Sequence, residues 1–238
     1  MRTGNRLVLF HSVELVMTKE NLRTMKSRKE IVEILERLGV SRKTIDHSIE
    51  TADVALKIAN EMAGDGIQVD RKIVEAGALL HDCELDKPPK GAPTMIFEKV
   101  NREVHVDPSH ATRGGKRVRE LGFPEPVARC VDRHEGLYTR DEAMLLHIMP
   151  SPSGDLLPET PEEKAVNYSD NMLFVVGSGY DPWKDSDAIA RGLFEYIDKT
   201  FKALTGTGLT MEHPILQRQI QKNLELRKYA KPEFFKKP

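Results

Sequence analysis

Residues 76–82, Ala-Gly-Ala-Leu-Leu-His-Asp, place an adjacent histidine and aspartate at the end of an apolar run. Asp70 can cap a helix that begins at about residue 71 and contains this run. Projection at about 100° per residue puts His81 near Val74 on the apolar side of that helix, with Asp82 at its end. The stretch therefore predicts a core helix that ends in a polar pair.

Further histidines and an aspartate recur at wide intervals around this pair. His47 lies 34 residues before His81, and His110, His134 and Asp170 follow Asp82 after gaps of 28, 24 and 36 residues. Such spacing is too wide for a zinc finger, whose ligands are close in sequence. Only a folded bundle could bring these residues to one metal site.

The same projection tests whether these residues face the core. His47 falls at the edge of the buried arc of its predicted helix, and Asp170 shares the inner face of another with Val166 and Leu173. A buried carboxylate without a partner costs several kcal/mol, so Asp170 needs a cation or hydrogen-bond donors there. A single inward histidine is most often a satisfied core residue. Five such positions, His134 included, indicate a metal site.

Hydrophobic periodicity and capping residues predict an all-α fold. We expect a bundle over residues 27–205, with an N-terminal extension at 1–26, a strand at 6–10, and a C-terminal helix with a frayed basic tail at 206–238. Gly114 and Gly115 inside a helix indicate close approach of another backbone or a ligand. The expected helices lie at about 28–38, 42–63, 71–82, 109–121, 125–135, 161–176, 185–204 and 214–228.

Two long connections interrupt this helical pattern. Residues 83–109 contain Pro88, Pro89 and Gly91, and they predict a loop with a small β-hairpin that could serve as a lid. Residues 135–160 predict a second loop, which ends at a capping box beginning with Thr160. Neither connection carries a recognised motif, so the substrate is not specified by them.

Composition excludes several classes of protein. The 238 residues are 39% hydrophobic and 31% charged, and the net charge of −1 gives no pull toward long nucleic acids or anionic membranes. The apolar stretch at residues 7–17 is too short to span a bilayer. Cys83 and Cys130 provide no disulfide framework, which favours a cytoplasmic protein.

The polar residues, in this order, resemble the motif of the HD superfamily of metal-dependent phosphohydrolases. The matching pieces are Asp-His-Ser-Ile-Glu-Thr-Ala at 46–52, the stretch at 76–82, and Tyr-Ser-Asp at 168–170. The resemblance implies an all-α HD-domain bundle with metal held among its helices. It also implies hydrolysis of a nucleotide or another small phosphorylated molecule by a metal-activated water.

His110 and His134 resemble the additional ligands of the superfamily members that bind two metals. By this resemblance His47, His81, Asp82 and Asp170 hold one ion, and His110 and His134 hold the second, with Asp82 bridging. Mixed imidazole and carboxylate ligands suit divalent transition metals such as Fe, Mn, Zn, Co or Ni. The superfamily's usual glycine and basic residue after His-Asp are absent, since Cys83 and Glu84 follow.

Positive groups are expected to neutralise the phosphate beside the catalytic Asp82. Lys87, Arg113 and Arg133 are the candidates, with Lys116 and Arg117 as further cations. Ser48, Thr51 and Thr112 are candidates for substrate contact.

Two other functions stay open at this point. One is a di-iron oxygenase of the HD type, and the other is a non-catalytic nucleotide-binding regulatory protein. The amphipathic C-terminal helices could pack on the core or on a second subunit, so a homodimer also stays open.

Overall fold

The computed structural model describes residues 25–92, 94–97 and 102–236. The predicted strand at 6–10 and nearly all of the N-terminal extension therefore lie outside the described residues.

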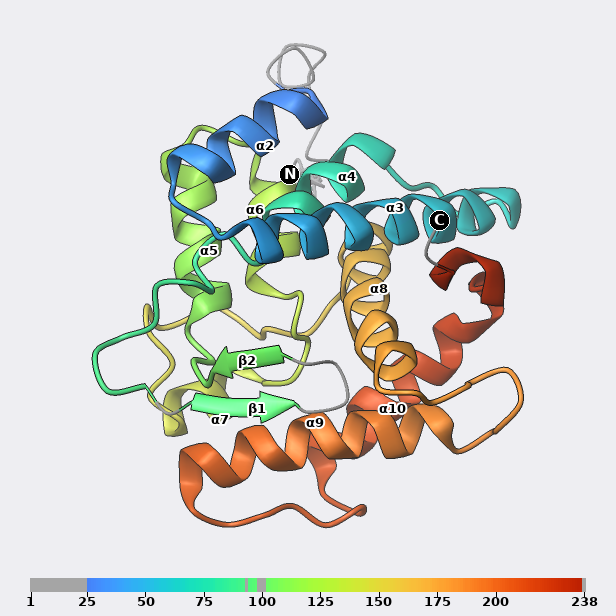
Figure 1. Cartoon of the computed structure of the whole chain (residues 1–238). Coiled ribbons are helices and arrows are strands. Elements are labelled where there is room, and N and C mark those ends of the chain that lie inside the picture. The colour runs from blue at the N-terminus through green and yellow to red at the C-terminus, as the bar shows by residue number, and fades with distance from the viewer. Residues whose placement is uncertain (1–24, 93, 98–101, 237–238) are drawn as a thin grey trace, which may run out of the picture.

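The regular secondary structure of the described residues is helical, apart from two short strands (Figure 1). The predicted all-α bundle with a small hairpin is confirmed. In chain order the elements are α2 (Arg28–Arg37), α3 (Arg42–Gly64), α4 (Arg71–Leu80), β1 (Thr94–Phe97), β2 (Arg102–His105), α5 (His110–Glu120), α6 (Glu125–Asp132), α7 (Arg140–Leu145), α8 (Pro161–Gly177), α9 (Ala188–Thr205), α10 (Pro214–Leu226) and the 3₁₀ turns η2 (Arg227–Tyr229) and η3 (Pro232–Phe235).

Side-chain caps begin the helices where the sequence places capping residues. Ser27 and Thr160 each open a helix through a reciprocal capping box with a glutamate three residues later. Ser41 and Asp70 accept hydrogen bonds from backbone amides of α3 and α4. These bonds satisfy donors that the first turn of a helix leaves without intrahelical partners, so local chemistry sets the helix starts.

The core forms where α3, α4, α6 and α8 pack together (Figure 1). α3 lies along α4 and crosses α8, and it buries the small residues Ala52, Ala55 and Ala59 at these contacts. Gly77 of α4 lies so close to α6 that an added Cβ would sit 2.6 Å from Cys130 Cβ. Small residues therefore let the helices that carry the predicted site residues approach closely.

The predicted close approach at Gly114 and Gly115 is confirmed. A Cβ on Gly114 would meet Val131 Cγ1 at 2.9 Å, and one on Gly115 would overlap the carboxylate of Asp132. Val131 and Asp132 are the last two residues of α6, so it is α6 that approaches α5 at these glycines.

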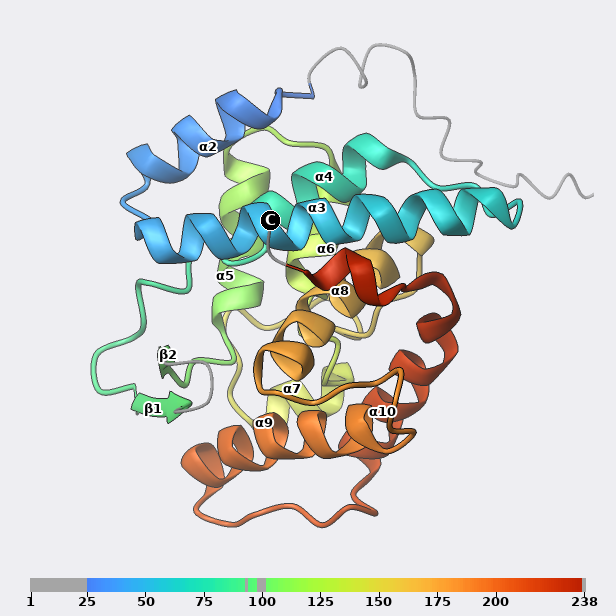
Figure 2. The same ribbon diagram turned by 45° about the vertical axis from the view of Figure 1, so that its right-hand side comes forward.

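The two strands pair as the antiparallel hairpin predicted for residues 83–109. Thr94 lies opposite His105, and Phe97 lies opposite Arg102. β1 contacts α9, and Figures 1 and 2 both show the hairpin beside one end of that helix. The insertion therefore spans the side of the bundle between α5 and α9.

The prediction of a continuous loop at 135–160 was wrong in one place. Residues 140–145 form α7, which Thr139 opens with a capping box to Glu142. The helix buries Ala143 while Met144 and Leu145 are exposed, so it has no apolar face for periodicity to detect. Its signal was the capping box alone.

The prediction of a frayed C-terminal tail was wrong as far as residue 236. η3 packs Phe235 against Trp183, with ring centroids 5.4 Å apart, and Lys231 pairs with Glu61 of α3 at 2.7 Å. Burial of the aromatic ring stabilises a segment whose basic composition suggested a solvated end. The tail thus returns to the helix that carries His47.

None of the described helices is both long and apolar enough to cross a membrane. Cys83 and Cys130 are both buried and unpaired. Burial raises the pKa of Cys83 to about 12 and that of Cys130 well above its ordinary value, so both act as small core residues.

Gly77→Ala tests the close packing of α4 on α6. The added methyl group overlaps Cys130, and overpacking of this kind costs about 1–3 kcal/mol. The expected result is a lower denaturant midpoint with an unchanged slope. Gly64→Ala is the control, because nothing lies within 4 Å of its added Cβ and alanine gains up to about 1 kcal/mol in a helix. Equal stability of the two variants would contradict the packing argument.

Candidate metal centre

Six side chains from five parts of the bundle meet in its interior. Among the described residues they form three overlapping sets of histidine and carboxylate atoms, each set within 4.8 Å. α3 supplies the first residue, the end of α4 the next two, α5 the fourth, the turn after α6 the fifth and α8 the last. The six are His47, His81, Asp82, His110, His134 and Asp170.

Asp82 lies at the middle of this cluster, and its two oxygens face different histidine pairs. Oδ2 lies 3.3 Å from Nε2 of His81 and 3.8 Å from Nε2 of His47. Oδ1 lies 3.4 Å from Nε2 of His110 and 3.5 Å from Nε2 of His134. One carboxylate therefore joins two groups of imidazole nitrogens.

Asp170 completes the first of these two groups. Its Oδ1 lies 3.0 Å from Nε2 of His47 and 3.6 Å from Nε2 of His81. The Asp170 side chain is 25% exposed, whereas His81 is fully buried. The group thus runs from the interior to an accessible edge formed by Asp170 and His47.

Backbone carbonyls orient three of the four imidazoles. In His81, His110 and His134, Nδ1 lies 2.7–2.8 Å from the carbonyl oxygen three residues earlier. A carbonyl only accepts hydrogen bonds, so Nδ1 carries the proton in each ring. In the neutral imidazole, Nε2 then carries a lone pair that is directed at the centre of the cluster.

This arrangement leaves lone pairs that need a cation. Nε2 of His110 and Nε2 of His134 face each other at 3.0 Å. Nε2 of His81 is buried beside Asp82 and Asp170 without a hydrogen bond. Burial lowers the pKa of His81, but these two carboxylates raise it well above its ordinary value, so a positive charge is favoured at this nitrogen. Two facing lone pairs repel unless a proton or a metal ion lies between them, and histidine nitrogens beside carboxylates are ligands for divalent transition metals. The residues present therefore fit a metal centre.

The electrostatics of the clustered side chains support the same conclusion. Burial lowers the pKa of His110, but Glu135 and Asp82 raise it to about 9. Burial, together with His110 and His81, lowers the pKa of His134 to about 3. The opposite directions of these two shifts indicate that the facing pair favours a single positive charge between its rings.

The two carboxyl groups of the cluster are ionised. Burial alone would raise the pKa of Asp82, but His81 and His110 hold it well below its ordinary value. Burial is likewise outweighed at Asp170, where His47 and His81 lower the pKa. Metal ligands bind in their deprotonated forms, so both carboxylates are ready for a cation.

Glu135 is a buried acid beside the cluster that the sequence analysis missed. Its Oε1 lies 3.9 Å from Nδ1 of His110, and burial raises its pKa to about 7. It lies in a turn after α6, where helical periodicity does not report burial. Its only sequence signal is its position next to His134.

α8 and α10 hold the turn that carries His134 and Glu135. Asn167 donates a hydrogen bond to the His134 carbonyl at 2.6 Å, and Gln219 donates one to the Glu135 carbonyl at 2.8 Å. Gly136 follows with a φ of +64°, and a Cβ there would lie 2.6 Å from Asn167 Nδ2. The turn is therefore positioned by side chains of α8 and of the C-terminal helix.

The predicted phosphate-binding cations Lys87 and Arg113 are engaged beside the cluster. Lys87 lies 3.4 Å from Glu84, and Arg113 forms an ion pair with Asp107 at 2.6 Å. Arg113 also donates hydrogen bonds to the carbonyls of Glu84 and Lys87, which brace the turn after Asp82. Their role toward phosphate stays a prediction.

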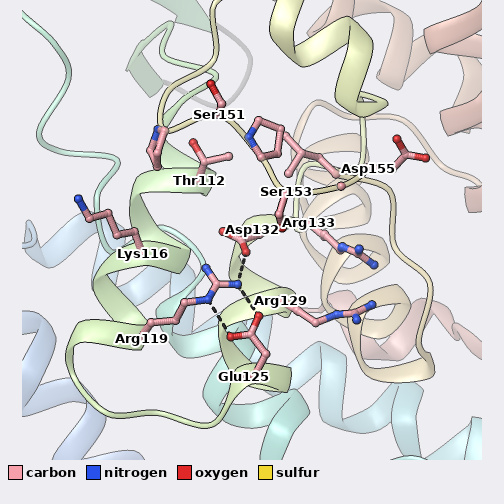
Figure 3. Close-up of a pocket in the computed structure, with 14 residues that line it drawn as sticks. Thr112, Lys116, Arg119, Glu125, Arg129, Asp132, Arg133, Ser151, Ser153 and Asp155 are labelled. Atoms are coloured by element: carbon pink, nitrogen blue, oxygen red, sulfur yellow. Dashed lines mark hydrogen bonds and ion pairs between the residues drawn. The ribbon is translucent and has the colours of Figure 1, made fainter. Parts of the chain in front are cut away.

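Arg133 lies at a different cavity, of about 410 Å³, between α5, α6 and the loop at 150–156 (Figure 3). It pairs with Glu159 at 2.8 Å and with Glu163 at 3.0 Å. Figure 3 shows Arg119 joined to Glu125 and Asp132 in the same cavity. Its role toward phosphate also stays a prediction.

The predicted substrate contacts at Ser48, Thr51 and Thr112 fall on buried positions. Thr51 donates a hydrogen bond to the His47 carbonyl, and Thr112 donates one to the Ser109 carbonyl. Both hydroxyls are thus bonded within their own helices or helix starts. Contact with substrate stays a prediction for all three.

Two cavities flank the cluster. The inner cavity, about 50 Å³, is lined by Asp82, His110, His134, Asp170, Glu135 and Asn171, and by apolar side chains of Leu85, Phe174, Leu193 and Tyr196. The outer cavity, about 560 Å³, lies on the side of His47. Asp170 and Phe174 line both cavities, so α8 borders both spaces.

Fold and site together define an all-α protein with a buried His…His-Asp…His…His…Asp centre. The family model of the HD domain matches residues 44–172. The chain therefore belongs to the HD domain family, and the resemblance noted from the motif is confirmed. The matched range contains all six cluster residues, with Asp170 near its end.

Two relatives each match about half of the chain. An uncharacterized protein of Methanocaldococcus jannaschii is 31% identical over 135 residues, which cover 56% of this chain and 68% of that protein. A tRNA (cytidine(56)-2'-O)-methyltransferase of Picrophilus torridus is 32% identical over 134 residues. That match covers 56% of this chain but 33% of the methyltransferase, so it spans a minority of the enzyme.

Solved structures with similarity include the HD domain of the L. monocytogenes phosphodiesterase PgpH. Its complex with cyclic-di-AMP gives a TM-score of 0.42 at 17% identity, covering 84% of this chain and 96% of that chain. A second structure of the same HD domain gives a TM-score of 0.41 at 16% identity, and the match covers 83% of this chain and 97% of that chain.

Substitution of the cluster residues tests the metal centre. Asp82→Ala removes the carboxylate shared by both histidine groups, so we expect loss of all bound metal, whereas His110→Ala is expected to lose half. The measurement is elemental analysis after reconstitution with Mn(II) or Fe(II) and dialysis. His147→Asn is the control, because this exposed histidine has a φ of +55° that asparagine tolerates. Retention of the full metal content by Asp82→Ala would refute the centre.

Gln219→Leu tests whether α10 positions the turn after α6. Loss of its hydrogen bond to the Glu135 carbonyl is expected to weaken metal binding about tenfold, as loss of an outer partner of a metal ligand typically does. Metal affinity is measured by competition with a chelator. Gln221→Leu, on the exposed face of the same helix, should bind metal as the unmodified protein does. If both variants bind equally well, α10 has no positioning role.

Proposed function

We propose that the protein is a metal-dependent phosphohydrolase that acts on a nucleotide or another small phosphorylated molecule. The observation that carries this proposal is the position of Asp82, whose two oxygens face two separate groups of imidazole nitrogens. Membership of the HD domain family supports it. The relevant reaction is cleavage of a phosphate ester or anhydride by water.

The ligand assignment follows the two groups around Asp82. We assign His47, His81 and Asp170 to the first ion and His110 and His134 to the second, with Asp82 shared by both. Mixed nitrogen and oxygen donors suit Fe, Mn, Zn, Co or Ni. Two such ions, when bound, would supply an activated water and neutralise charge on the phosphoryl oxygens.

The protein's own side chains hold this centre in place. The carbonyls that bind Nδ1 of His81, His110 and His134 keep each Nε2 directed inward. The carboxylates of Asp82 and Asp170 counter the charge of bound cations within the bundle. Glu135 adds a further carboxyl to the wall of the inner cavity.

The outer cavity supports a small organic substrate. Its volume of about 560 Å³ lies in the range typical of small-molecule sites, about 300–1,000 Å³. Phe174 and Phe235 line it beside His47 and offer apolar surface for a nucleoside or a similar group. The near-neutral chain provides no basic belt for a long nucleic acid.

Hydrolysis is tested with a panel of phosphate monoesters, phosphate diesters and nucleotides in the presence of Mn, Fe(II), Co or Ni. We expect turnover with at least one pair of metal and substrate. Asp82→Ala should lower kcat/KM by more than about a hundredfold, beyond the loss typical of an outer partner of a metal ligand. His147→Asn should retain the rate.

The same assay separates the competing functions. Oxygen consumption by the Fe(II) protein with a polyol or an aminophosphonate, without phosphate release, would favour a di-iron oxygenase. Nucleotide binding without turnover under any metal would favour a regulatory protein. Either result would contradict the proposed hydrolase.

A further inference from the structure

Asn171 follows Asp170 on α8 and lines the inner cavity. The residue is 8% exposed, and its Nδ2 atom is buried without a hydrogen-bond partner. A buried amide without a partner loses its bonds to water on folding and gains none in exchange. Native structures contain few such groups, and each one calls for an explanation.

The cavity around this amide is small, and residues of two chemical kinds line it. Asp82, His110 and His134 belong to the metal centre, whereas Leu85 and Leu193 are apolar. Asn171 is also among the lining residues, so its amide borders the space that adjoins the proposed ions.

The volume limits what can enter. At about 50 Å³ the cavity is roughly one third of the 150 Å³ that a benzene-sized apolar cavity provides. A phosphoryl group can extend into such a space, whereas a nucleobase cannot. The phosphoryl oxygens accept hydrogen bonds, so they match a donor that has no partner in the protein.

We propose that Asn171 Nδ2 donates a hydrogen bond to a phosphoryl oxygen of the substrate in the inner cavity, which makes Asn171 a further catalytic residue. The proposal rests on the proposed function, because it assumes that a phosphoryl group binds at the metal centre. The larger part of the substrate then lies toward the outer cavity, because Asp170 and Phe174 border both spaces.

The test compares Asn171→Leu with the unmodified full-length protein, both loaded with Mn(II). Leucine has a similar size and lacks the donor. The measurements are kcat/KM for p-nitrophenyl phosphate, the inhibition or binding constant of inorganic phosphate, metal content, and the melting temperature. Asn60→Ala, an exposed change on α3, serves as the control.

We expect Asn171→Leu to weaken phosphate binding and lower kcat/KM by about tenfold to a hundredfold, the loss typical of a hydrogen bond to a charged group. Metal content should stay unchanged. The melting temperature should stay equal or rise, because the change removes an unpaired buried amide. A purely structural asparagine would show the opposite pattern, with lower stability and an unchanged kcat/KM.

Further variants keep the outcome decisive if the leucine variant fails to fold. Asn171→Ala should show the same loss of phosphate affinity, and Asn171→Ser, which retains a smaller donor, should recover part of it. Phosphate binding and kcat/KM equal to those of the unmodified protein, in any folded variant without a donor, would overturn the role of Asn171 and leave the hydrolase proposal standing. If the fully metal-loaded unmodified protein neither hydrolyses the ester nor binds phosphate, both proposals are overturned.

Discussion

Two imidazole nitrogens that face each other in the protein interior set the main physical constraint on this structure. Nε2 of His110 and Nε2 of His134 lie 3.0 Å apart, while both Nδ1 atoms bind backbone carbonyls. The pair needs a cation, and Asp82 Oδ1 lies within 3.5 Å of both nitrogens to balance its charge. The same carboxylate faces His81 on its other side. The bundle is thus organised around a charged centre that separate helices must complete together.

Close helix packing makes this convergence attainable. Gly77 lets α4 approach α6, and Gly114 lets α5 approach the same helix. α10 then holds the turn after α6 through Gln219, so the C-terminal helix supports the centre although none of its residues belongs to it. Loss of packing at these contacts would displace ligands by more than a metal site tolerates, because ligand geometry is specific to within a fraction of an ångström.

The order of the six cluster residues and its resemblance to the HD motif indicated one site, and the positions of His81, His134 and Asp170 on apolar helix faces supported it. A histidine or aspartate on an apolar helix face is costly without a partner, and periodicity detects that conflict for residues such as Asp170. Glu135 and Asn171 escaped notice for different reasons. Glu135 lies in a turn, where no periodic face exists, and Asn171 differs from a solvated amide only in its lack of a partner, which requires coordinates. The ion pair between Arg113 and Asp107 could not be predicted from the sequence either, because it depends on how the chain folds around both residues.

The sequence by itself indicated every described α-helix except α7, because propensity and capping act locally along the chain. The order of the six polar residues and its resemblance to the HD motif indicated the candidate ligands. Only the tertiary structure decided that the two oxygens of Asp82 face different histidines, and which predicted cations form ion pairs with other residues. It also decided that Phe235 lines the outer cavity near His47. Those features depend on distances between segments far apart in sequence. Burial of an aromatic ring, rather than the charge of its neighbours, decided the place of the tail.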